Sequence, residues 1–106
     1  MTERDDTKRR RAELKHRYGL AYRQLSEILF TQDPIGIRFE TNTDEYEPEV
    51  DTILPRLRTC SDTAEVNRVV HEEFVRWFGT SEAGPSAKYQ TIAKKIWAEV
   101  LPYLFS

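Results

Sequence analysis

Hydrophobic residues recur along this chain at the three- and four-residue spacing of amphipathic helices. The first such stretch predicts one helix over about residues 7–31, with Gly19 inside it, where a close helix crossing is permitted. Asp33 and Pro34 end this helix, because a residue that precedes proline is disfavoured in the α-helical region. The apolar positions of the stretch are Leu14, Tyr18, Ala21, Tyr22, Leu25, Ile28 and Leu29.

A second, short amphipathic stretch predicts a helix over about residues 44–57, with Thr43 or Asp44 as its N-cap. Pro55 has no backbone donor, and its ring clashes with the carbonyl four residues earlier. We therefore expect a kink or a break near Asp51. The apolar positions are Val50, Ile53, Leu54 and Leu57.

Two longer amphipathic stretches complete the pattern. The first predicts a helix that begins at Ser61 or Asp62 and ends at Gly79, followed by a loop over residues 80–86. The second predicts a helix over about residues 89–104. We expect the apolar positions of both helices to form the core: Val66, Val69, Val70, Phe74, Trp77, Phe78, Tyr89, Ile92, Ala93, Ile96, Trp97, Val100, Leu101 and Leu104.

Between the first two helices the spacing of apolar residues changes to two. Ile35, Ile37 and Phe39 alternate with other residues, which is typical of extended chain. Because no second strand-like run is present to pair with this segment, we expect an ordered extended loop over about residues 32–43 that lies across the helices.

The composition agrees with one small globular domain. Apolar residues make up 39% of the 106 residues and charged residues 32%, which suits a soluble core-forming chain. No apolar run approaches the roughly 20 residues of a membrane span, and no secretory signal is visible, so we expect a cytoplasmic protein. The prediction is a single all-α domain over residues 1–106, a four-helix bundle or an orthogonal helical domain, with residues 1–6 disordered.

Few residues in the sequence are candidates for catalysis or metal binding. Cys60 is the only cysteine, which excludes an intrachain disulfide and a multi-cysteine zinc site. It precedes a predicted helix, but neither His16 nor His71 is near it in sequence, so we interpret it as a small turn residue. We interpret both histidines as solvated helical residues. The prediction is a protein that is not an enzyme, with no cofactor and no metal site.

Charge is distributed unevenly along a chain whose net charge is −2. Residues 33–51 contain seven carboxylates and one arginine, which indicates a solvated acidic surface able to bind a basic partner. A site for a small ligand, a metal or catalysis that uses Asp33 and Asp44 is an alternative. Nucleic-acid association through the basic run Lys8–Arg11 is another, which the acidic net charge disfavours.

Two short motifs flank the extended segment, Asp33-Pro-Ile-Gly-Ile37 and Asp44-Glu-Tyr46, and Glu49-Val-x-x-Ile-Leu54 follows them. Their order and spacing over about residues 20–80 resemble those of a family of small, uncharacterised bacterial helical proteins, known as domains of unknown function. Gln32 departs from the pattern, since relatives often have tryptophan there. The resemblance implies a small bacterial helical protein and transfers no reaction, substrate or catalytic residue.

The motifs have a structural and a functional interpretation. Asp33 before proline favours a turn, Gly36 permits positive φ, and Tyr46 can bury its ring and reach back with its hydroxyl, which would clamp the loop. We also expect a non-enzymatic protein–protein interaction module, immunity-like by fold-level analogy, which binds a basic protein as a monomer or homodimer without membrane. Its predicted partner-binding residues are Asp33, Gly36, Asp44, Glu45, Tyr46 and Glu47.

Overall fold

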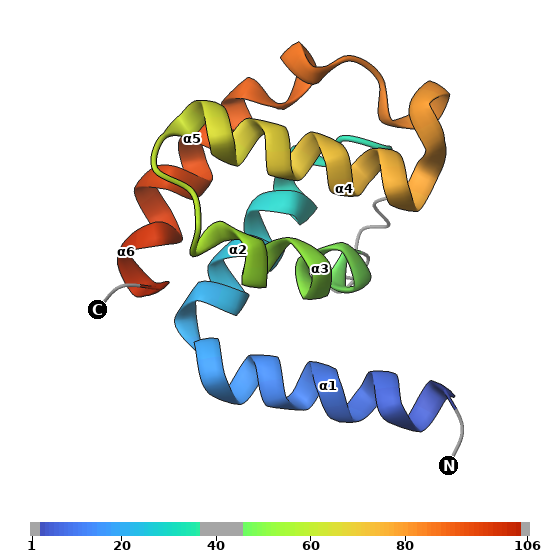
Figure 1. Ribbon diagram of the computed structural model, residues 1–106, viewed down its shortest axis with the longest axis vertical. Helices are drawn as coiled ribbons and strands as arrows, with labels where there is room; N and C mark the ends of the chain where they lie inside the picture. Colours follow the sequence, from blue (N-terminus) through green and yellow to red (C-terminus); the bar gives the residue numbers. More distant parts are fainter. Residues whose placement is uncertain (1–2, 37–45, 105–106) are drawn as a thin grey trace.

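The described residues of the chain fold almost entirely into α-helices (Figure 1). The computed structural model describes residues 3–36 and 46–104, and it contains no strand in these ranges. This confirms the all-α prediction, although the four predicted helices correspond to six α-helices and one 3-10 turn. The elements are α1 (Glu3–Tyr18), α2 (Leu20–Gln32), α3 (Glu47–Leu57), α4 (Thr63–Ala83), η1 (Ser86–Tyr89), α5 (Gln90–Glu99) and α6 (Leu101–Leu104).

The first predicted helix is divided at Gly19. This glycine has φ 44° and ψ −108°, a combination that residues with a side chain rarely adopt. As a result α1 turns away from α2 and runs along the lower edge of the molecule in Figure 1. The prediction of one helix over residues 7–31 is therefore wrong, because apolar periodicity continues across a glycine that bends the backbone.

The helix α3 is continuous from Glu47 to Leu57, with Pro55 inside it. Of the predicted kink or break near Asp51, the break is wrong. Burial provides the reason, because the apolar stripe of α3 is fully enclosed and its contacts offset the hydrogen bond that proline removes. The predicted N-caps, Thr43 and Asp44, lie outside the described residues, and Tyr46 precedes the helix without a side-chain cap.

The start of α4 agrees with the prediction. The Asp62 carboxylate accepts a hydrogen bond from the Glu65 amide at 2.8 Å, and the Glu65 carboxylate accepts one from the Ser61 amide at 3.0 Å. Gly79, with φ 85°, interrupts the regular helix where its end was predicted. The chain then forms another helical turn that ends at Ala83, so the prediction of a loop throughout 80–86 is wrong.

The last predicted helix also consists of shorter pieces. Residues 86–89 form η1, α5 ends at Glu99, and α6 contains Pro102. Because Pro102 cannot donate to the carbonyl four residues before it, the chain does not continue as one regular helix. Within the described ranges, no helix has both the length and the apolar character needed to cross a membrane.

Aromatic rings occupy the centre of the core. The ring centroids of Tyr46, Phe78 and Tyr89 lie 5.9, 5.7 and 5.3 Å from that of Phe74. Tyr46, Phe74 and Tyr89 are fully buried, and aliphatic residues of α2 to α6 enclose them. Ile35 packs against this core from the turn after α2, as the loop prediction expected, whereas Ile37 and Phe39 lie outside the described residues.

Two residues predicted to lie in the core are exposed instead. Trp77 retains 45% of its accessible surface and Trp97 retains 38%. Tyr46 and Tyr89 fill the interior together with Phe74, and the Trp77 indole donates to the Thr52 hydroxyl at 3.0 Å. An indole at the margin of a helical stripe keeps its polar N–H in contact with a polar partner in this way.

The backbone at Gly19 gives a direct test of the bend between α1 and α2. Gly19→Ala is expected to lower the free energy of unfolding by about 1–3 kcal/mol, because alanine is strained at this positive φ. No atom lies within 4 Å of the added Cβ, so a steric clash does not contribute to the loss. Urea unfolding measures the change. D-alanine at this position, introduced by chemical ligation, matches the positive φ and serves as the control. Unchanged or increased stability of Gly19→Ala would contradict the bend.

Glu49 gives a pH-dependent test of the core. This residue of α3 is 4% exposed, and burial raises its pKa from 4.5 to about 6. Above pH 6 the Glu49 side chain is ionised in both the folded and the unfolded chain, and the buried charge destabilises the fold. Below pH 4.5 the side chain is protonated in both states, and this destabilisation is absent. Glu49→Gln should therefore raise the unfolding free energy at neutral pH by on the order of 1 kcal/mol, with no gain in acid. Thermal unfolding across this pH range measures the difference, and an equal effect at all pH values would refute it.

Candidate functional site

The motifs on both sides of the 37–45 segment meet at Tyr46. The Tyr46 hydroxyl donates to the Asp33 carboxylate at 2.7 Å and accepts from the Ile35 amide at 3.2 Å. Asp33 has φ 47° at the end of α2, and its carbonyl accepts from the Gly36 amide at 3.1 Å. The predicted clamp between the first two motifs is confirmed. The Asp33 carboxylate takes part in it directly, because it accepts the hydrogen bond from the Tyr46 hydroxyl.

The predicted partner-binding residues occupy different environments. Gly36 is exposed and has φ 78°, as the motif predicted, and Asp33 is half-buried. Tyr46 is fully buried and acts from inside the core. Glu47 has 15% of its side chain exposed. Asp44 and Glu45, the other two, lie outside the described residues.

Basic residues of α1 cover the acidic start of α3. Lys15 Nζ lies 2.9 Å from a Glu47 oxygen, and Arg11 Nε lies 2.9 Å from an Asp51 oxygen. Tyr22 of α2 donates to the other Asp51 oxygen at 2.8 Å, and burial together with this bond raises the pKa of Tyr22. The acidic surface predicted here as solvated is thus partly enclosed by the chain's own cations.

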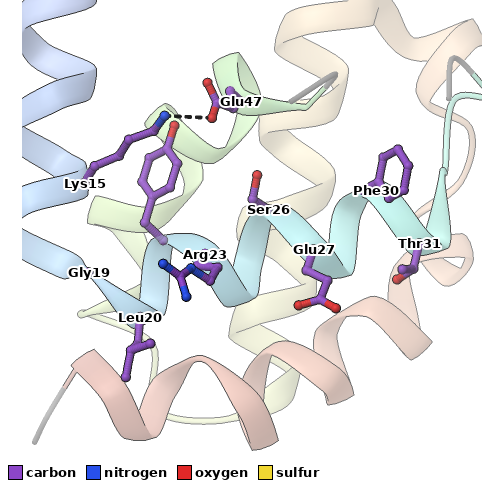
Figure 2. A pocket seen from close by; sticks show the side chains of 10 residues that line it. Lys15, Gly19, Leu20, Arg23, Ser26, Glu27, Phe30, Thr31 and Glu47 are labelled. Carbon is purple, nitrogen blue, oxygen red and sulfur yellow. Dashed lines mark ion pairs between the residues drawn. The ribbon is translucent and has the colours of Figure 1, made fainter. Parts of the chain in front are cut away.

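An open groove runs along the outer side of α2, and we call it the α2 groove (Figure 2). It has a volume of about 780 Å³, within the range of ligand pockets. The Lys15–Glu47 ion pair lies at one edge, and Leu20 and Phe30 stand at opposite ends of α2 in Figure 2. The lining residues are Lys15, Gly19, Leu20, Tyr22, Arg23, Ser26, Glu27, Phe30, Thr31 and Glu47.

Of the residues that line the α2 groove, only Glu47 was among the partner-binding residues predicted from the sequence. Leu20 is 50% exposed and Phe30 is half-buried, although both are large and apolar. Neither belongs to the apolar stripe that α2 buries. Large apolar residues outside the buried stripe of an amphipathic helix are the signal that could have located this groove.

The candidate nucleophile and bases do not form a catalytic set. Cys60 is buried, and burial raises the pKa of its thiol, which keeps it protonated at neutral pH. His71 is half-buried rather than solvated as predicted, because its Nε2 donates to the Gly84 carbonyl at 2.9 Å and its ring contacts Tyr89. His16 is exposed on α1. In the part of the chain that the structure describes, no three His, Cys, Asp or Glu residues are grouped to hold a metal ion.

Comparisons with protein-family models, with curated proteins and with solved structures find no match to this chain. The structure shows a small all-helical protein, and the resemblance to the bacterial family stays a prediction.

The Tyr46 hydroxyl gives a test of the clamp. Tyr46→Phe is expected to lower the unfolding free energy by about 1–3 kcal/mol, because it leaves the Asp33 carboxylate and the Ile35 amide without this partner. Tyr18→Phe is the matched control, since the Tyr18 hydroxyl makes no hydrogen bond within the described ranges. Chemical denaturation of the two variants measures the effect, and equal losses in both would rule out the clamp.

Proposed function

We propose that this chain is a non-enzymatic protein–protein interaction module whose α2 groove binds a basic, partly apolar segment of another protein. The proposal rests on Leu20, a large apolar side chain that lines an open groove and is half-exposed. An exposed apolar side chain in a groove with polar neighbours offers a partner an apolar contact surrounded by a polar rim, as in protein-binding sites. Leu20 and Phe30 would contact the apolar side chains of the partner.

Glu27 is the residue of the α2 groove that supports a basic partner, in a lining that also contains the cations Lys15 and Arg23. Glu27 is exposed and makes no ion pair with any described residue, so a lysine or arginine of the partner can pair with it. Glu47 is paired with Lys15 and Arg11 of α1, so Glu27 is the carboxylate of the groove that is open to a partner. Asp44 and Glu45 precede Glu47 in the sequence and add negative charge to the same stretch. Such complementarity raises association rates and makes them depend on salt.

The chemistry of the lining residues supports binding over catalysis. Neither histidine nor cysteine lines the α2 groove. The thiol of Cys60 is buried and protonated, and the His71 ring is held by Gly84, so neither is positioned as a nucleophile or base for a ligand at α2. The groove offers apolar contact and ion pairing, which are the interactions of a recognition surface.

A displayed library of random linear peptides, selected on the immobilised full-length chain, tests this function. Selected peptides should combine lysine or arginine with large apolar residues, and their affinity should fall as salt rises. Glu27→Lys and Leu20→Ser should each weaken binding by about tenfold, which corresponds to about 1.4 kcal/mol. Glu99→Lys, at an exposed position of α5, is the matched control and should bind normally.

Two results would contradict the proposed function. The first is a selection that yields no peptide with affinity above that for an unrelated helical protein. The second is a selected peptide that binds Glu27→Lys and Leu20→Ser as tightly as it binds the unchanged chain, because contact would then lie elsewhere.

A further inference from the structure

A second groove lies between α1, α3 and α4, and we call it the α1–α4 groove. It has a volume of about 780 Å³ and shares no lining residue with the α2 groove. Side chains that are far apart in the sequence meet in it, including Arg10 and Arg17 of α1 with Arg76 and Trp77 of α4. The proposed function does not use this surface.

The carboxylates that line the α1–α4 groove are already paired with arginines. Asp51 binds Arg11 at 2.9 Å, and Glu73 binds Arg56 at 2.8 Å. Arg56 also binds Glu72 at 2.7 Å, and these hydrogen bonds raise its pKa. The acidic charge of the groove is therefore largely neutralised by side chains of the protein itself.

Three arginines of the groove remain for an external anion. Arg10 and Arg17 are exposed, and neither makes an ion pair with a side chain that the structure describes. Arg76 has 75% of its side chain exposed and lies 3.9 Å from the buried Glu73, a long contact that leaves its other donors free. The three guanidinium groups come from two helices and line one groove, which gives it a local excess of positive charge.

An exposed aromatic ring lies beside these cations. Trp77 is 45% exposed, and its indole N–H is fixed by the hydrogen bond to Thr52, which also lines the groove. The ring therefore offers an accessible surface whose orientation is set before a ligand arrives. Tyr18 lines the same groove, with the Arg17 guanidinium 5.6 Å from its ring centroid. Glu73 adds a buried oxygen that has no hydrogen-bond partner among the described residues.

We propose that the α1–α4 groove binds single-stranded nucleic acid, with a base stacked on Trp77 and backbone phosphates paired with Arg10, Arg17 and Arg76. Aromatic stacking combined with cationic contacts to the backbone is the physical basis of single-strand binding. A duplex would keep its bases stacked on one another, so Trp77 favours a single strand. An acidic peptide would use the arginines without needing the fixed indole.

The site shares Arg10 with the basic run Lys8–Arg11 that the sequence suggested, and its other groups lie outside that run. Arg11 is bound to Asp51 and Glu47, so it is committed to holding α1 against α3. The aromatic partner comes from α4, more than sixty positions further along the chain. Only the folded chain brings Trp77 and Arg76 of α4 beside the arginines of α1.

Fluorescence anisotropy with a short labelled oligouridylate and the full-length chain at low ionic strength tests the proposal. Trp77→Leu is expected to weaken binding by about fivefold or more, because it removes the stacking surface. Its matched control is Trp97→Leu, which removes an exposed indole from α5 and should leave binding unchanged. The fluorescence of Trp77, measured in the Trp97→Leu background, should be quenched on binding.

The arginines are tested by the dependence of affinity on salt. R10Q/R17Q should reduce the slope of the logarithm of affinity against the logarithm of salt concentration by about 1.4, since each contact to a single strand contributes about 0.7. Arg58→Gln, an exposed position at the end of α3, is the matched control and should keep the slope. Circular dichroism confirms that each variant is folded.

Several outcomes would overturn the proposal. Absence of binding at low salt would do so. Equal binding of heparin, polyglutamate or duplex DNA, unaffected by Trp77→Leu, would show general attraction of polyanions. Preferred binding of polyglutamate would assign the groove to an acidic protein. Each of these results leaves the α2 groove and its peptide selection untouched, so the two proposals fail separately.

Discussion

Tyr46 combines apolar burial with hydrogen bonding at a point where α2, α3 and α4 meet. Its ring is fully buried and lies 5.9 Å from that of Phe74 in α4, while its hydroxyl binds Asp33 and Ile35 just after α2. The helix α3 begins at the next residue. Burial of this ring therefore fixes where α3 starts relative to α2, and with it the position of Glu47 at the edge of the α2 groove.

The bend at Gly19 has an equally wide effect. It directs α1 across α3, where Arg11 and Lys15 meet Asp51 and Glu47. Both grooves include residues of α1, so both depend on this placement. The helix α1 buries little apolar surface of its own, and ion pairs with partly enclosed carboxylates contribute more to its position than they would at a fully exposed surface.

The local chemistry of the sequence predicted several features well. These features are the cap of α4 by Asp62 and Glu65, the turn at Asp33 and the hydrogen bond of the Tyr46 hydroxyl. Each involves a side chain that binds nearby backbone or a motif close in the sequence. Features that depend on tertiary packing could not be predicted in this way. Trp77 lies on the helical stripe but outside the filled core. Pro55 is tolerated because its helix is buried. His71 binds the Gly84 carbonyl, which packing of the folded chain brings next to it. The two grooves likewise depend on contacts between distant segments.

Hydrogen exchange at the Ile35 amide, followed by nuclear magnetic resonance, tests most directly whether Tyr46 organises the structure. The amide lies in a turn outside any helix, and its partner is the tyrosine hydroxyl. The account predicts protection comparable to that of amides in α3, because the bond opens only when the core around Tyr46 opens. Exchange of Ile35 at the rate of an unstructured peptide would contradict it.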